Sequence, residues 1–352
     1  MLIQHDKLRD LVTKMMIAAK SDEAEARAVA DNLVDANLMG HDSHGVGLAP
    51  RYMKNARAGE MTVGGRASVI TENGPYLLVD GNMGYGQIVG PETMELGIAR
   101  ARDHGCAIVG LRNVHHLGRI GAWAEMCVEA GFISIHYVNA TGHIPYVAPF
   151  GGYEARYSTN PYCTGIPASD KYPRIILDMA TSRVAQGKVR VAHYKGVEMM
   201  DEALVGADGK PTNDPSVIFN DPTGAMLSFG QHKGFGLAML CEILAGGLTG
   251  GGASRPDKLD EDTIRNNMLT IIMDPNGFDT GAGFPSEIDR LQDWVRSSKA
   301  AEGHDKVRFA GDPERETMEK RKVDGIEIDD NTWAEMRERS VEFGMDPAAF
   351  GN

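Results

Sequence analysis

The 352-residue chain holds 36 basic and 49 acidic side chains, so its formal net charge is −13. Hydrophobic residues make up 42% of it and charged residues 24%, the balance of an ordinary globular protein, which excludes a disordered chain, a coiled coil or a collagen-like repeat. A chain this acidic repels phosphate backbones, so general nucleic-acid binding is disfavoured, and its length predicts two lobes.

The sequence predicts neither a membrane span nor a signal peptide. The most apolar stretch, residues 235–248, is shorter than a span and contains Glu242. The N-terminus lacks a basic region followed by an apolar run. The four cysteines form no C-x-x-C pair and have apolar neighbours, which predicts buried reduced thiols in a cytoplasmic protein rather than disulfides or a metal site.

The first 60 residues predict helices. Asp6 can cap a helix whose apolar residues recur every three or four positions. Ser21 can cap a second helix, with acidic residues in its first turn, that ends at Gly40. A third, shorter helix ends near Gly59.

From residue 76 the pattern alternates between short apolar strands and helices, which is typical of an α/β lobe. Strands are predicted at 76–80, 106–111, 132–138, 175–178 and 268–273, and helices at 88–102, 120–130 and 233–244. The Gly- and Pro-rich stretch 142–170 predicts a functional loop. Two further helices, 287–298 and 332–343, are expected to pack on the N-terminal ones.

The segment G-Y-G-Q-I-V-G at 84–90 resembles a dinucleotide-binding glycine loop, because it follows an apolar run and precedes a helix. Its spacing is looser than G-x-G-x-x-G. The next strand ends at Arg112, whereas a Rossmann fold needs an acidic residue there for the ribose. We therefore interpret the segment as a glycine turn, although an arginine at that place would suit a phosphorylated ribose.

Two histidine clusters are better candidates for chemistry. H-D-S-H-G, at 41–45, follows a helix end, and N-V-H-H-L-G-R-I-G, at 113–121, follows a strand end, where α/β proteins place ligands. Imidazoles can pass protons near neutral pH. A single histidine is more often structural, but two clusters beside glycines favour a functional site.

Two other positions carry candidate ligand groups. Asp178 ends an apolar strand, and its buried charge needs partners, either the backbone N–H groups of Ala180 and Thr181 or an imidazole whose basicity it raises. Lys233 opens a helix in H-K-G-F-G-L, which suits an anion such as a cofactor phosphate. The alternative for Lys233 is a solvated surface side chain.

These motifs together resemble the malate/L-lactate dehydrogenase-like oxidoreductases, a family with an NAD(P)-binding fold that is not a Rossmann fold. The resemblance covers nearly the whole chain. The matching blocks are G-H-D-S-H-G-V (40–46), P-R-Y (50–52), V-D-G-N-M-G-Y-G-Q (79–87), H-H-L-G-R-I-G-A-W-A-E (115–125), A-P-F-G-G (148–152), S-T-N-P (158–161), L-D-M-A-T-S (177–182), G-K-P-T-N-D-P (209–215) and K-G-F-G-L-A (233–238).

The resemblance implies an α/β (α+β) fold. A mixed-sheet domain at residues 69–284 would bind cofactor and substrate, and residues 1–68 with about 285–352 would form a helical domain. The family also implies a homodimer and reversible hydride transfer between NAD, or alternatively NADP, and a 2-hydroxy acid/2-oxo acid pair.

The resemblance further implies roles for single residues. In the catalytic set of His116, His44 and Asp178, His116 takes the hydroxyl proton, Asp178 orients its ring, and His44 with Ser43 bonds the substrate oxygen. The substrate-binding set is Ser43, Leu48, Arg51, Thr159 and Asn160. The cofactor-binding set is His44, Gly118, Arg119, Ile120, Ile176, Leu177, Asp178, Met179, Ala180, His232, Lys233, Asn267 and Gly311.

Some positions depart from the family pattern. Leu48 stands where many members have an arginine suited to a substrate carboxylate, which favours a larger, more apolar 2-oxo acid. Ser158 replaces a glycine, and Ala310-Gly311 replaces a Pro-Gly pair.

Other activities fit parts of the pattern. The same family includes reducers of cyclic imino acids, and a site of this type would serve a C=N bond as well. A metal-dependent hydrolase could use His41, His44, His115 and His116, although no recognised zinc signature is present. The clustered titratable groups disfavour a binding protein without catalysis.

Overall fold

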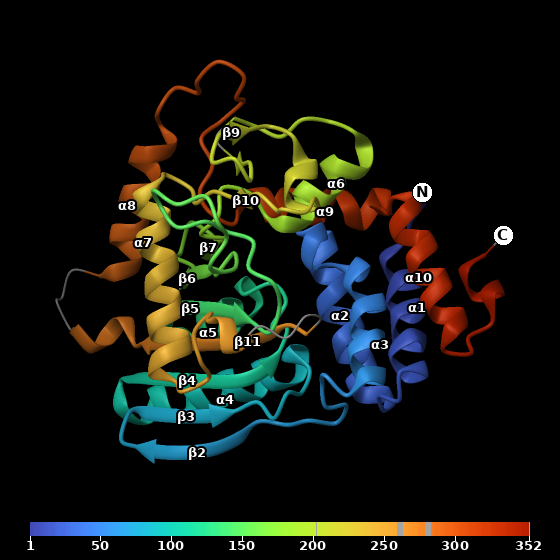
Figure 1. Cartoon of the computed structure of the whole chain (residues 1–352). Helices are drawn as coiled ribbons and strands as arrows, with labels where there is room; N and C mark the ends of the chain where they lie inside the picture. Colours follow the sequence, from blue (N-terminus) through green and yellow to red (C-terminus); the bar gives the residue numbers. More distant parts are fainter. Residues whose placement is uncertain (202, 259–262, 279–282, 352) are drawn as a thin grey trace.

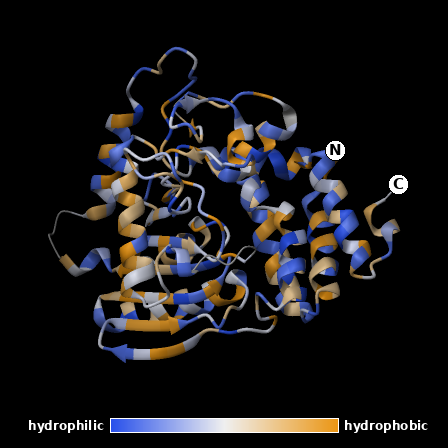
Figure 2. Cartoon of the chain, viewed as in Figure 1, coloured by the Kyte–Doolittle hydropathy of each residue, from blue (hydrophilic) through white to orange (hydrophobic). Residues whose placement is uncertain are grey.

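The computed structural model describes residues 1–201, 203–258, 263–278 and 283–351. A helical body built from both ends of the chain lies beside an α/β body (Figure 1). Hydrophobic residues are frequent on the strands of the α/β body and along α7 (Figure 2). No helix in the described ranges is long and apolar enough to cross a membrane.

A seven-stranded mixed sheet forms the centre of the α/β body, as the resemblance implies. Its strand order is β2-β3-β4-β11-β5-β6-β7. Among these described strands only β3 and β4 pair in parallel. The strands are β2 (Ser68–Asn73), β3 (Tyr76–Asp80), β4 (Cys106–His115), β11 (Arg265–Met273), β5 (Ile133–Thr141), β6 (Tyr162–Ile166) and β7 (Ile175–Met179).

Helical segments pack on both faces of this sheet. Neighbouring residues of a strand point to opposite faces, and β4 shows this at Val109 and Gly110. Val109 faces α4 (Gly86–His104), where a Cβ on Gly97 would lie 2.9 Å from it. Gly110 faces Thr249, the residue after a π-helix, Glu242–Leu248, that continues α7 (His232–Cys241). A second helix, α5 (Gly121–Glu129), packs beside α4.

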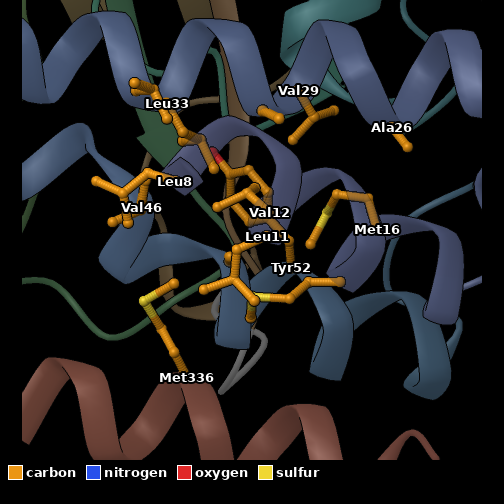
Figure 3. Packing of buried hydrophobic residues seen from close by; sticks show 14 of the residues in the cluster. Leu8, Leu11, Val12, Met16, Ala26, Val29, Leu33, Val46, Tyr52 and Met336 are labelled. Atoms are coloured by element: carbon orange, nitrogen blue, oxygen red, sulfur yellow. The ribbon is translucent and has the colours of Figure 1, made fainter. Parts of the chain in front are cut away.

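The helical body confirms the three predicted N-terminal helices, which are α1 (His5–Ala18), α2 (Glu23–Leu38) and α3 (Ala49–Ala58). Asp6 does not cap α1, because the helix begins at His5 after Gln4 and Asp6 lies within its first turn. The residue that caps α2 is Asp22 rather than Ser21, because the carboxylate of Asp22 accepts from the backbone N–H of Glu25 at 2.8 Å. The apolar faces of these helices meet in one buried cluster that includes Leu8, Leu33 and Tyr52 (Figure 3).

The C-terminal helices do not all join this cluster. α10 (Asp330–Glu342) does, through the fully buried Met336 (Figure 3). α8 (Phe284–Arg296) does not, and the expectation for that segment is therefore wrong. Its Asp293 accepts a hydrogen bond from Tyr172 at 2.5 Å, so α8 attaches to the α/β body. A further helix that the apolar periodicity does not predict, α9 (Asp312–Asp324), contacts α2. The predicted domain boundaries at residues 68 and 285 stay predictions.

Short elements tie the rest together. β1 (Leu2–Ile3) pairs with β12 (Ile326–Glu327), which joins the two ends of the chain. A small three-stranded sheet of β10 (Ala225–Met226), β8 (Leu204–Val205) and β9 (Pro211–Thr212) packs near α6 (Gln186–Lys195). The apolar pattern predicts none of these short strands, because two residues are too few to show a period.

Candidate active site

A cavity of about 850 Å³ lies between the helical body and the α/β body. The turn after α2, the β4–α5 turn, the end of β7 and the first turns of α6 line it. The predicted site residues among its lining are Ser43, His44, Leu48, Gly118, Arg119, Ile120, Thr159, Asp178, Met179 and Ala180. Segments from distant parts of the sequence thus form one site.

His44 lies on a turn of 3-10 helix, Asp42–His44, that follows α2. Its Nδ1 is 3.1 Å from the hydroxyl of Ser43. Burial is the main cause that lowers the pKa of His44 to about 4, with smaller contributions from His41 and Arg119. The imidazole is therefore neutral near pH 7, and its Nε2 is the nitrogen left to meet a ligand.

His116 follows the end of β4, and its ring stacks on that of His44 with centroids 5.6 Å apart and an interplanar angle of 13°. Its Nδ1 lies 2.7 Å from the hydroxyl oxygen of Tyr52. Gln87 Nε2 donates to the same oxygen at 3.2 Å. His116 is half-buried and is not among the described residues that line the cavity. Its ring stacks on that of His44, which does line the cavity.

The pKa of His116 is also lowered well below its ordinary value. Burial is the largest cause, followed by the neighbouring His44, His115 and Arg51. Burial keeps the pKa of Tyr52 far above its ordinary value, so the phenol stays protonated. The site therefore holds two stacked neutral imidazoles, one of which is fixed by a neutral phenol.

Asp178 does not bond His116, which corrects the predicted orienting role. Its carboxylate accepts from the backbone N–H of Gly121 at 2.7 Å. Gly121 begins α5, and the start of a helix attracts negative charge. Of the two partners expected for this buried carboxylate, a backbone N–H group or an imidazole, the backbone N–H group is right. The donor, however, is Gly121 rather than Ala180 or Thr181. Burial raises the pKa of Asp178. Its contact with a cofactor stays a prediction.

Two predicted binding residues have structural partners instead. Asn160 Nδ2 donates to Glu242 at 2.8 Å, and its Oδ1 accepts from the backbone N–H of Ala140 at 3.2 Å. Asn267 Nδ2 donates to Asn139 at 2.9 Å. Both asparagines are fully buried, so their amides hold strands and loops together rather than face the cavity.

The remaining predicted residues lie at other places. Ile176 and Gly311 line a smaller cavity of about 60 Å³ that shares Arg119 and Asp178 with the large one. Four more are outside the described lining of either cavity, namely Arg51, Leu177, His232 and Lys233. His232 is the first residue of α7, and the centroid of its ring lies 5.8 Å from that of Phe150.

Several functional candidates could not be predicted from the sequence. Tyr52 and Gln87 lie in matched blocks, but nothing in their local sequence pairs them with His116, which is 64 positions from Tyr52. Lys188 and Arg190 line the cavity from α6. A local excess of basic residues at 183–190 was the available signal.

The residues fit a bound dinucleotide. The cavity volume is within the range of small-molecule and cofactor sites. Lys188 and Arg190 supply positive charge suited to a diphosphate in an otherwise acidic protein. Gly118 adopts a positive φ of 70° at the cavity wall, a conformation in which glycine is unstrained.

The glycines at 84–90 have a packing role, which confirms their interpretation as a glycine turn. A Cβ on Gly84 would lie 2.4 Å from the carbonyl oxygen of Gly65, and one on Gly86 would lie 2.3 Å from that of His116. Arg112 pairs with Asp80 at 2.9 Å, so its charge already has a partner.

No group of three or more His, Cys, Asp or Glu side chains in the described ranges could hold a metal ion. The proposed hydrolase ligands His41 and His44 lie on the same turn, but His41 pairs with Glu314 at 3.4 Å. His115 lies beneath Tyr52, with ring centroids 5.2 Å apart.

Comparisons with known proteins show what this chain is similar to. The family model described as malate/L-lactate dehydrogenase matches residues 3–337. Hydroxycarboxylate dehydrogenase B of Escherichia coli (strain K12) is 41% identical over 333 residues, which are 92% of this chain and 90% of that protein. Within the family, the motif H-H-L-G-R-I-G and the segment 241–252 also indicate a likeness to this member.

Solved structures of similar fold include malate/lactate dehydrogenases. The structure of a putative malate/lactate dehydrogenase from E. coli is similar with a TM-score of 0.95 and 38% identity, covering 99% of this chain and 98% of that one. Δ1-piperideine-2-carboxylate reductase from Pseudomonas syringae pvar. tomato has a TM-score of 0.81 and 28% identity, covering 96% and 99%. None of the described relatives is a hydrolase.

Proposed function

Because the chain belongs to the malate/L-lactate dehydrogenase family, we propose that it is an NAD(P)-dependent 2-hydroxycarboxylate dehydrogenase. The observation that carries this proposal is the stacked pair of neutral imidazoles, His44 and His116, beside a cavity large enough for cofactor and substrate. NAD is the proposed cofactor, with NADP as the alternative.

His116 is the proposed proton-transfer residue. When bound, the nicotinamide supplies the acceptor or donor of the hydride. Oxidation of a 2-hydroxy acid also releases the hydroxyl proton, and a neutral imidazole can take it. In the proposed neutral tautomer Nδ1–H donates to the Tyr52 oxygen, so the unprotonated Nε2 is the atom that accepts this proton. The same hydrogen bond then stabilises the imidazolium.

His44 is the proposed partner of the substrate oxygen. Ser43 engages its Nδ1, which leaves Nε2 to hydrogen-bond the hydroxyl or keto oxygen. A fixed donor at this place stabilises the charge that develops on oxygen as the hydride leaves or arrives. Gly118, Arg119, Ile120 and the residues from Asp178 to Ala180 would hold the cofactor.

The proposed substrate side chain is bulky or apolar. Leu48 and Val46 line the cavity, and the neighbouring wall carries Glu327 of β12 and Asp329, the residue before α10. A second substrate carboxylate placed there would meet two like charges and no described cation of that wall. The cations that line the cavity lie on other walls, Arg119 in the turn before α5, Arg183 after β7, and Lys188 and Arg190 on α6.

An assay with a panel of 2-oxo acids tests this function. The purified protein is given pyruvate, phenylpyruvate, oxaloacetate and a cyclic imino acid, each with NADH and with NADPH. Reduction of the keto acids, with phenylpyruvate preferred over oxaloacetate, is the expected result. Faster turnover of the imino acid would favour instead the second candidate, a C=N reductase like the structurally similar P. syringae enzyme.

A homodimer is the proposed assembly, and α7 with the π-helix after it is its proposed interface. Leu240, Ile243 and Leu248 are 46%, 60% and 68% exposed along this segment. From residue 234 to 248 its only charged residue is the buried Glu242. Such an exposed apolar face suits an interface with a second copy of this chain, because in a twofold-symmetric dimer the same helix face of each subunit can pack against the other.

Sedimentation of single variants tests the interface. Ile243→Glu should convert the dimer to a monomer, because it would bury a charge at the contact. Val323→Glu on α9, where the side chain is 77% exposed, is the matched control and should stay dimeric. A monomeric wild-type protein would reject the proposal. A cytoplasmic location is proposed as well, since all four cysteines are free thiols.

A further inference from the structure

The turn that carries His44 has little secondary structure of its own. Two successive 3-10 turns, Asp42–His44 and Val46–Leu48, link α2 to α3. Such short turns make few internal hydrogen bonds, so contacts from outside determine where the imidazole lies. Those contacts include the stacked ring of His116, the start of α6, the last turn of α2 and α9.

α9 presents one face to this turn. Glu314, Thr317 and Arg321 are spaced three and four residues apart, which puts them on one side of the helix. A Cβ on Gly40 would lie 3.3 Å from the Thr317 methyl, and Glu314 pairs with His41 at 3.4 Å. α9 has no fully buried residue, so polar contacts, rather than a deep apolar face, fix it here.

Arg321 makes the most directed of these contacts. Its two terminal nitrogens bond the two carboxylate oxygens of Asp42 at 2.6 and 3.0 Å. It also donates to the backbone carbonyl of Asn37 in the last turn of α2, where a helix attracts positive charge. A bidentate pair of this kind fixes direction as well as distance.

Asn37 extends the same network to the far side of His44. Its Nδ2 donates to Asp42 at 2.6 Å, and its Oδ1 accepts from the backbone N–H of Val46 at 2.8 Å. A Cβ on Gly45 would overlap the Asn37 amide, so the chain passes directly over it. Residues 42 and 46, on either side of His44, are thus tied to one buried amide and one guanidinium.

We propose that Arg321 is a positioning residue for the reaction, acting through Asp42 to hold the His44 imidazole against the cavity. The proposal rests on the proposed function of His44. Its contribution is to geometry more than to stability, because the Asp42 side chain is half exposed and exposed ion pairs stabilise little. Displacement of a reacting group by about 1 Å can lower a rate about a hundredfold.

Four variants test the proposal in the full-length protein. Arg321→Met should lower kcat at least tenfold for the best 2-oxo acid, with the Kd for NADH unchanged within twofold and Tm within a few degrees. Arg321→Lys, which keeps the charge but not the bidentate geometry, should retain an intermediate kcat. Asp42→Asn should match Arg321→Met, and the double variant should be no worse than either. Lys322→Met, an exposed neighbour on α9, is the matched control.

A second readout does not depend on turnover. The side-chain ¹⁵N signals of His44, assigned with a His44→Gln variant, should shift in Arg321→Met and not in Lys322→Met. Unchanged signals together with wild-type kcat in Arg321→Met would overturn the proposal. If the wild-type protein reduced no 2-oxo acid, the proposed function would fail, while the His44 signals would still decide whether Arg321 positions the turn.

Discussion

The hydroxyl of Tyr52 lies beside His116 where a carboxylate often supports a proton-transferring imidazole. A carboxylate would raise the pKa of the ring, whereas a neutral phenol leaves burial as the dominant effect. The ring is therefore neutral near pH 7, the state in which it can accept a proton.

Replacement of His116 tests its role directly. His116→Ala should lower kcat by about 10²- to 10⁴-fold, the usual contribution of a general acid–base group. The Kd for NADH, measured by fluorescence titration, should change little because the proton-transfer atom faces the substrate. Near-normal turnover of this variant across the pH range would reassign proton transfer, with His44 as the next candidate.

Replacement of Tyr52 tests the phenol. Its oxygen stabilises the imidazolium of His116, so Tyr52→Phe should lower the pKa of His116 further. Since oxidation needs the neutral ring, the acid limb of its pH–rate profile should lie below pH 6.5 and move lower in the variant. We expect kcat to fall about tenfold, the effect of one hydrogen bond.

Tyr85→Phe is the matched control for this experiment. Tyr85 lies in the same core, with its ring 6.0 Å from that of Tyr52, and its hydroxyl bonds Ser21 rather than a histidine. It should keep the wild-type profile. A Tyr52→Phe profile that superimposes on the wild-type one would show that the phenol does not act through His116.

At the scale of elements, apolar periodicity accounts for what the sequence could predict. α1 and α2 have continuous buried faces, and the buried strands of the sheet read as apolar runs. α9 has no such face, because its contacts to the His44 turn are polar. Of the described side chains of α6, the buried hydrophobic ones are Val189 and Ala192 alone, and the two-residue strands near it are too short to show a period. The helices that periodicity misses are therefore those that border the cavity.

The turn that leads into α3 carries a prediction on substrate choice. Leu48 is the residue before α3, and it packs on the helical core while lining the cavity. Leu48→Arg should raise the ratio of kcat/KM for oxaloacetate to that for phenylpyruvate, because it adds a cation and removes apolar surface. Leu48→Met, which conserves volume, should leave the ratio nearly unchanged.

Steady-state kinetics at matched NADH measure this ratio. Asp329, which also lines the cavity, could pair with the introduced arginine and reduce the gain. The double variant with Asp329→Asn therefore gives the upper limit. Oxaloacetate as the best substrate of the wild-type protein would show that Leu48 does not select against a second carboxylate.

On the scale of the whole molecule, the site exists only where the two bodies meet. His44 comes from the helical body and His116 from the end of β4, and their rings stack across the junction. The sequence could place each histidine in a turn beside glycines. It could not show that Tyr52 or Arg321 would reach them, because these contacts depend on how helices far apart in the chain pack.

The junction and the sheet also bury several imidazoles, which makes the fold sensitive to acid. Burial lowers the pKa of His44 and His143 to about 4 and that of His115 and His136 to about 3. In an unfolded chain these rings take up protons near pH 6.5, so unfolding binds protons between that pH and the lowered values. Their stabilising effect is complete above about pH 6.5 and is lost as the pH falls toward 4.

We therefore expect Tm to fall steeply between pH 6.5 and 5, above the range in which most carboxylates titrate. His136 bonds Thr270 and Ser134 inside the sheet, away from the cavity. His136→Gln should reduce by about one the number of protons taken up on unfolding. The slope of the unfolding free energy against pH should then fall by about 1.4 kcal/mol per pH unit. His104→Gln, at an exposed helix end, should keep the wild-type slope. Calorimetry from pH 7.5 to 5 measures this, and a Tm that stays constant over that range would mean that the buried rings are protonated in the folded protein.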